Sequence, residues 1–76
     1  MITVEQVLNE PRFFDDPSNI KSFFSLPVER MHEFMKHPDK YVRLAAVSHA
    51  RIEDVPLFIS DPYAPIRKMV VNRIKG

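Results

Sequence analysis

The chain has 76 residues, about half of a usual domain, so it has room for only one small domain. It contains no cysteine, which excludes disulfides and thiolate metal sites. Eleven Lys and Arg residues against ten Asp and Glu residues give a formal net charge of +1, which argues against a strongly basic nucleic-acid binder. The charge is uneven: residues 1–36 have four basic and six acidic side chains, net −2, and residues 37–76 have seven and four, net +3.

Targeting signals are lacking in the sequence. Residues 1–5 have neither the basic nor the apolar region of a signal peptide, and no apolar run approaches the length of a membrane span. We therefore expect a cytoplasmic protein that has no membrane partner.

Proline and glycine usage indicates an all-α fold. The seven prolines fall between apolar stretches or at their first turn, where a missing N–H costs nothing, and the one glycine is Gly76. A β-sheet would need the Gly-containing hairpin turns that this chain lacks. The pattern predicts short helices with abrupt starts.

The first predicted helix covers residues 3–9. Thr3 and Gln6 have the spacing of a capping box ahead of apolar residues, and Pro11 ends the helix. Residues 13–17 combine two phenylalanines with Asp, Asp and Pro, which predicts a turn that adds aromatic side chains to the core.

The later helices follow at short intervals. Ser18 or Asp16 is expected to cap a second helix that carries apolar side chains at helical spacing. Pro27 has the place of a first helical residue, and residues 37–39 end one helix and cap the next. The remaining helices are predicted over residues 28–35, 41–49, 52–59 and 65–74.

An internal repeat is the most informative feature. A shift of 24 residues aligns residues 37–48 with residues 61–72, matching proline with proline and one aliphatic-arginine pair with another. The same shift aligns the apolar pattern of residues 28–35 with that of residues 52–59. A short helix cannot bury its apolar face alone, so the copies are expected to stack as an α-solenoid.

The repeat subdivides the single domain. An N-terminal capping helix is expected in residues 1–12, followed by units at 13–36, 37–60 and 61–76, of which the first is degenerate and the last truncated. The truncated unit has no following unit to cover its apolar side chains.

Four segments carry a more specific pattern: Leu26-Pro27-x-Glu29-x-Met31, Asp39-x-x-Val42-Arg43-x-Ala45-Ala46-Val47-Ser48, Ile52-x-x-Val55 and Asp61-x-x-x-x-Ile66-Arg67. Together they resemble the leucine-rich repeat variant, a HEAT-like α-helical repeat. The resemblance implies a right-handed superhelix in which each unit pairs an α-helix with a shorter helix. It also implies a ladder between adjacent units, in which Arg43 and Arg67 pair with Asp. Asp61 fits that ladder, and His37 replaces the Asp in the earlier unit.

Positions that differ between copies are better candidates for function, because stacking does not dictate them. Tyr41, Leu44 and Ser48 form one stripe on the helix over 41–49, which is continued on the last helix by Lys68 and Asn72. An alternative is that Tyr41 and Leu44 belong to the inter-unit core. The predicted binding residues are Lys40, Tyr41, Leu44, Ser48, Lys68, Val71, Asn72 and Arg73.

Catalytic and metal sites are not predicted. The serines lack a Gly-x-Ser-x-Gly elbow, there is no glycine-rich phosphate loop, and the three histidines lack metal-ligand spacing. The histidines are expected to face solvent or to cap helices. The sequence predicts a non-enzyme with no cofactor and no small-molecule substrate.

The predicted function is therefore protein–protein interaction, as a small adaptor or inhibitor that docks on a larger protein or self-associates through its C-terminal helix. The alternative is a nucleic-acid backbone-binding module that uses the basic C-terminal helix, where Lys68, Arg73 and Lys75 lie with Arg67 and Arg51 nearby.

Overall fold

Helices make up all the regular structure in the computed structural model, which describes residues 2–76, and no strand occurs in that range. The predicted all-α class is confirmed. The described chain measures 33 × 22 × 18 Å along its principal axes. Its α-helices and 3-10 helices (η) run in the order α1 (Val4–Leu8), η1 (Phe13–Asp15), α2 (Asn19–Phe23), η2 (Val28–Phe34), α3 (Lys40–His49), η3 (Val55–Phe58) and α4 (Ala64–Lys75).

The starts of α1, α3 and α4 follow local sequence signals, whereas Ser18, a predicted cap of α2, makes no side-chain capping hydrogen bond. At α1 the predicted capping box is present, because the Gln6 N–H donates to Thr3 Oγ1 at 3.1 Å and the Thr3 N–H donates to Gln6 Oε1 at 2.8 Å. Asp39 caps α3 by accepting from the Tyr41 N–H at 2.8 Å. Pro65 stands in the first turn of α4, where it forfeits no hydrogen bond.

Two segments predicted simply as helices form 3-10 helices, η2 and η3. In a 3-10 helix, side chains three residues apart lie on one face. Met31 and Phe34 are spaced in this way in η2, as are Val55 and Phe58 in η3, and all four are buried. A short segment thus places two large side chains in the core.

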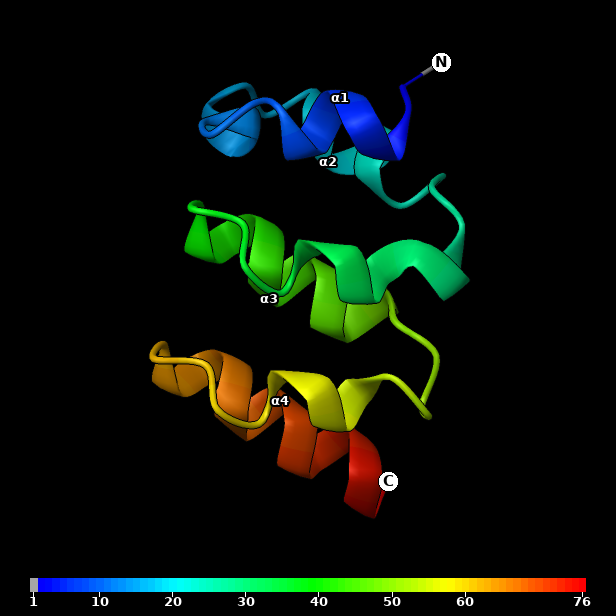
Figure 1. Cartoon of the computed structure of the whole chain (residues 1–76), viewed down its shortest axis with the longest axis vertical. Coiled ribbons are helices and arrows are strands. Elements are labelled where there is room, and N and C mark those ends of the chain that lie inside the picture. The colour runs from blue at the N-terminus through cyan, green and yellow to red at the C-terminus, as the bar shows by residue number, and fades with distance from the viewer. Residues whose placement is uncertain (1) are drawn as a thin grey trace.

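The elements are arranged in three tiers along the longest axis (Figure 1). We call α1, η1 and α2 the first tier, η2 and α3 the second, and η3 and α4 the third. Within the second tier α3 packs against η2, within the third α4 packs against η3, and α3 also packs against α4. The N-terminal and C-terminal ends lie at opposite ends of the stack.

One continuous core runs through the three tiers. In the first tier, Phe23 packs at 5.3 Å between ring centroids against Phe34 of the second tier. The buried apolar side chains are Val4, Val7, Phe13, Phe23, Leu26, Met31, Phe34, Val42, Ala46, Val47, Ala50, Val55, Phe58, Ile66 and Val70. Among residues 2–76, no helix has the length and apolar content needed to span a membrane.

Candidate protein-interaction surface

One polar contact recurs every 24 residues through the chain. Asn19 Nδ2 donates to the Phe13 carbonyl, Arg43 Nη1 to the His37 carbonyl, and Arg67 Nη1 to the Asp61 carbonyl, each at 2.7 Å. In each case a side chain at the start of an α-helix binds a carbonyl six residues earlier. In each tier, therefore, the same kind of hydrogen bond joins the start of the α-helix to the segment that precedes it.

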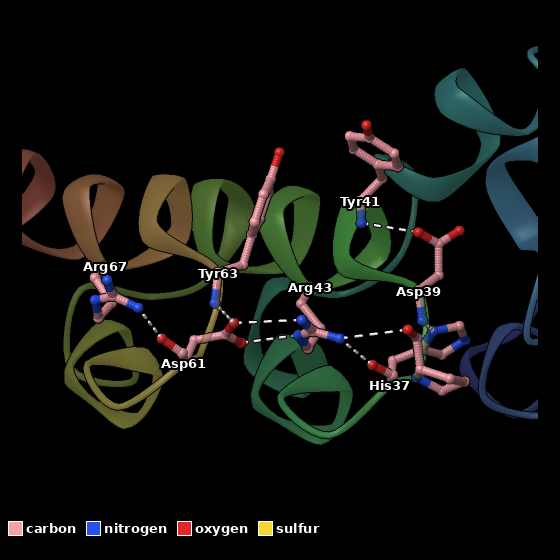
Figure 2. A network of polar contacts seen from close by, with 8 residues as sticks. His37, Asp39, Tyr41, Arg43, Asp61, Tyr63 and Arg67 are labelled. Carbon is pink, nitrogen blue, oxygen red and sulfur yellow. Dashed lines mark hydrogen bonds and ion pairs between the residues drawn. The ribbon is translucent and has the colours of Figure 1, made fainter.

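A buried ion pair joins the second and third tiers. Arg43 Nε donates to Asp61 Oδ2 at 2.8 Å, and Arg43 Nη2 donates to Asp61 Oδ1 at 3.3 Å (Figure 2). The side chains of Arg43 and Asp61 are only 13% and 3% exposed. The two-pronged geometry matches the planar guanidinium to the carboxylate. The inter-unit contact expected of these two residues is present.

The same position carries a histidine in the preceding tier. His37 Nδ1 accepts from the Asp39 N–H at 3.0 Å, just as Asp61 Oδ1 accepts from the Tyr63 N–H at 2.9 Å. Because Nδ1 accepts, Nε2 carries the proton and donates to the Val7 carbonyl at 2.8 Å. His37 was expected to face solvent or to cap a helix. It binds the amide that precedes α3, but it is buried because α1 lies over it.

A second recurring contact ties the end of each long helix to the tier before it. His49 Nε2 lies 3.1 Å from the Leu26 carbonyl, and 24 residues later Arg73 Nη1 donates to the Ala50 carbonyl and, at 3.0 Å, to the Val47 carbonyl. Both Val47 and Ala50 lie at the C-terminal end of α3, where carbonyls lack intrahelical partners. Arg73, predicted as a binding residue, is engaged in packing α4 on α3.

Equivalent positions in α3 and α4 differ sharply in exposure. Val47 is 0% exposed, whereas Val71, 24 residues later, is 46% exposed. Ala50 is 2% exposed and Ile74 is 55% exposed. The third tier covers the α3 face, and nothing within residues 2–76 covers the α4 face in the same way.

Arg67 lies beside these two apolar side chains, because residues 67, 71 and 74 share one side of a helix. We call Arg67, Val71 and Ile74 the terminal face. Figure 2 shows Arg67 at the outer end of a row that continues through Asp61 and Arg43 to His37. Within residues 2–76, the Arg67 side chain makes one hydrogen bond, through Nη1, and no ion pair.

The remaining predicted residues of α4 are on the surface. Lys68 and Asn72 are exposed, and so is Lys75 one turn further on. These side chains form a polar stripe next to the terminal face. The structure thus brings Lys68, Val71 and Asn72 together on α4.

The residues predicted on α3 do not all join that surface. Lys40 Nζ lies 4.8 Å from the Tyr63 ring centroid and 5.5 Å from that of Tyr41, so the cation is held over two aromatic rings. Leu44 is half-buried and packs against the core, and the Ser48 hydroxyl donates to a carbonyl of its own helix. Only Lys40 and Tyr41 combine exposure with a side chain suited to recognition.

Ion pairing leaves few cations unpaired near the C-terminal end. Arg51 Nε donates to Asp54 Oδ2 at 3.0 Å and Nη2 lies 3.0 Å from the same oxygen as an ion pair, and this hydrogen-bonded carboxylate raises the pKa of Arg51. Arg73 is bound to carbonyls. Among residues 2–76, Arg67, Lys68 and Lys75 of α4 make no ion pair, and of these three only Arg67 has a side-chain hydrogen bond, from Nη1 to the Asp61 carbonyl.

Two contributors to these contacts were missed in the sequence. Asn19 is the first-tier counterpart of Arg43 and Arg67, and the 24-residue shift, carried one step further, points to it. Arg67 was assigned to the ladder and to the alternative nucleic-acid surface, and it was not among the predicted protein-binding residues. Within the part of the chain that the structure describes, no group of three or more potential metal ligands is assembled.

Comparison with protein-family models, with curated proteins and with solved structures finds no match to this chain.

Proposed function

We propose that this chain is a short, right-handed solenoid of HEAT-like units, similar to the leucine-rich repeat variant, that acts as a non-catalytic protein-interaction module. The support for the repeat is the recurrence of side-chain contacts every 24 residues, at Asn19, Arg43 and Arg67 and again at His49 and Arg73. A small adaptor or an inhibitor of a larger protein fits a stack of this size.

The observation that carries the proposed function is the exposed fraction of Val71 and Ile74, at 46% and 55%, where the preceding copies are buried. Aliphatic side chains that share one helix face with an arginine form the kind of mixed patch that interfaces use. The partner binds the terminal face and covers both side chains.

Site-specific photocrosslinking in the cells that make the protein tests this proposal. A photoreactive amino acid at position 71 is expected to yield a discrete adduct with another protein, and Ile74→Glu is expected to abolish that adduct because it places a charge in the contact. The matched control is the same photoreactive residue in place of Leu57, which is aliphatic and 52% exposed but belongs to η3.

Equal adducts from positions 57 and 71 would contradict the proposal, as would an adduct that persists in the Ile74→Glu variant. An adduct whose mass is a multiple of the chain's own mass would indicate self-association instead.

A nucleic-acid function is the second candidate, and the unpaired Arg67, Lys68 and Lys75 on α4 favour it. Three phosphate contacts would give only weak, salt-sensitive binding. If this candidate holds, binding of a DNA duplex falls steeply with added salt and is lost in the Lys68→Glu, Lys75→Glu double variant. Arg73 is left unchanged in this test because it holds α4 on α3.

A further inference from the structure

We propose that the terminal face recognises a helical segment of its partner through an Asp or Glu side chain that pairs with Arg67, while apolar side chains of the same segment cover Val71 and Ile74. This inference rests on the proposed interaction function and specifies the chemistry of the partner.

The contact between the second and third tiers is the template for this inference. There Arg43 gives Nη1 to a carbonyl of its own tier and presents Nε and Nη2 to the carboxylate of Asp61. The same step of the stack buries Val47 and Ala50. The acidic side chain of Asp61 and the helix that follows it, α4, together cover this face of α3.

The terminal face repeats the template up to the point where the acid would bind. Arg67 Nη1 is fixed on the Asp61 carbonyl at 2.7 Å, as Arg43 Nη1 is on its own carbonyl. Its Nε and Nη2 have no hydrogen-bond partner within residues 2–76. Since one nitrogen anchors the guanidinium, its rotamer is already restricted, which lowers the entropy cost of binding a carboxylate.

Charge favours an acidic partner over a second copy of this chain. A symmetric contact between two terminal faces would bring Arg67, Lys68 and Lys75 of one copy against the same cations of the other, and like charges in a contact are unfavourable. A head-to-tail contact would present the first tier, in which Phe13 occupies the position that Asp61 has in the third tier. Neither arrangement places a carboxylate at the position that Asp61 has in the third tier; the exposed carboxylates of the first tier, on Glu5, Glu10, Asp15 and Asp16, lie at other positions of the repeat.

The experiment adds the proposed occupant to the full chain. A second copy of residues 52–75 is fused directly after Lys75 in place of Gly76, which keeps the 24-residue register and puts the copy of Asp61 in reach of Arg67. Tethering gives a high effective concentration, so weak binding is still detected. We expect slower amide hydrogen exchange in α4 and a higher denaturant midpoint than in the unmodified chain.

A double-mutant cycle then isolates the ion pair. Arg67→Gln and Asp→Asn in the added copy of position 61 are expected to be coupled, changing the unfolding constant by about tenfold beyond the product of their separate effects. Lys68→Gln is the matched control, with the same charge change one residue along α4, and its coupling to the same Asn is expected to stay below about twofold.

Three results would overturn the inference. The first is an added copy that exchanges as fast as an unfolded chain while exchange in α4 is unchanged. The second is Arg67→Gln coupling no more strongly than Lys68→Gln. The third is a dimer of the unmodified chain, seen in sedimentation and abolished by Ile74→Glu, or binding of a DNA duplex that is abolished by Lys68→Glu with Lys75→Glu. Crosslinking at position 71 without coupling at Arg67 would leave the proposed function standing and reject only the acidic chemistry.

Discussion

Two contacts hold the three tiers together. We call the contact between the first and second tiers the upper contact and that between the second and third tiers the lower contact. Both use one backbone geometry with different side chains. At the lower contact Asp61 binds the Tyr63 amide and reaches back to the Arg43 guanidinium. At the upper contact His37 binds the Asp39 amide and reaches back to the Val7 carbonyl. Both contacts keep the hydrogen bond from the backbone N–H two residues later. They differ in the group that the side chain meets in the preceding tier, and that group determines whether the side chain is histidine or aspartate.

The preceding tier determines which residue suits the position. The first tier has Asn19 where the second has Arg43, so an aspartate at position 37 would have no guanidinium to pair with. A neutral imidazole can donate to a carbonyl, and a carboxylate cannot. The buried polar contact here is therefore uncharged, and the one ion pair that joins the first and second tiers within residues 2–76, Arg30 with Glu5 at 2.6 Å, lies on the surface.

The largest predicted effect comes from breaking the buried charge pair. Asp61→Ala leaves the mostly buried Arg43 cation without its carboxylate and leaves the Tyr63 amide without its acceptor. Removing one member of a buried pair costs about 3 kcal/mol or more, which is a large fraction of the stability of a small domain. Chemical denaturation followed by circular dichroism measures the loss.

The control for this variant is Asp15→Ala, an exposed aspartate of η1, for which a change within about 0.5 kcal/mol is expected. A loss below about 1 kcal/mol for Asp61→Ala would show that the two contacts do not differ as described.

An intermediate effect is expected when the upper contact is converted into the lower one. Asn19→Arg alone adds an unpaired cation, and His37→Asp alone turns a carboxylate toward the Val7 carbonyl, so each should destabilise the fold. Together they recreate the Arg–Asp pair, and the double variant should be more stable than additivity predicts by about 1–2 kcal/mol. Asn19→Arg with His37→Asn is the matched control, because asparagine cannot form the ion pair. Strict additivity of the two changes would show that the two contacts are not geometrically equivalent.

Local signals in the sequence were sufficient for much of this architecture. The period of 24, the capping box at Thr3 and the cap at Asp39 all depend on residues close together in the sequence or on a fixed shift along it. The specific pairing of Arg43 with Asp61 was not among these signals, because a contact between side chains of adjacent tiers was expected only from the family resemblance. The 3-10 form of η2 and η3 was not predicted, because side chains three residues apart share a face in either kind of helix.

Contacts that depend on how one tier packs on another could not be predicted from the sequence. Arg73 and Lys68 are both cations of α4, but they lie on different sides of the helix, and the packing of α4 on α3 puts Arg73 against the Ala50 carbonyl and leaves Lys68 in solvent. The burial of His37 likewise depends on where α1 lies, and the degenerate first unit did not reveal that position.

The smallest predicted effect concerns the surface ion pairs of the upper contact. Arg30 hydrogen-bonds Glu33 and Glu5, and these bonds lower the pKa of both carboxyl groups from their ordinary value of 4.5. A carboxyl group whose pKa is lowered by folding stabilises the fold above its ordinary pKa, and that contribution disappears as the pH falls through the lowered pKa.

Arg30→Gln should therefore lower the Tm by only roughly 1–3 °C at neutral pH, since exposed ion pairs contribute little. The difference between the two chains should shrink toward zero as the pH falls below 4.5, because protonated Glu5 and Glu33 no longer pair with the guanidinium in either chain. Thermal unfolding followed by circular dichroism across this pH range measures it. Added salt should reduce the difference at neutral pH, because the pairs are exposed to screening ions. A difference that widens in acid would mean that Arg30 stabilises the upper contact through packing of its side chain, and the contrast with the buried Arg43–Asp61 pair would then not be one of charge.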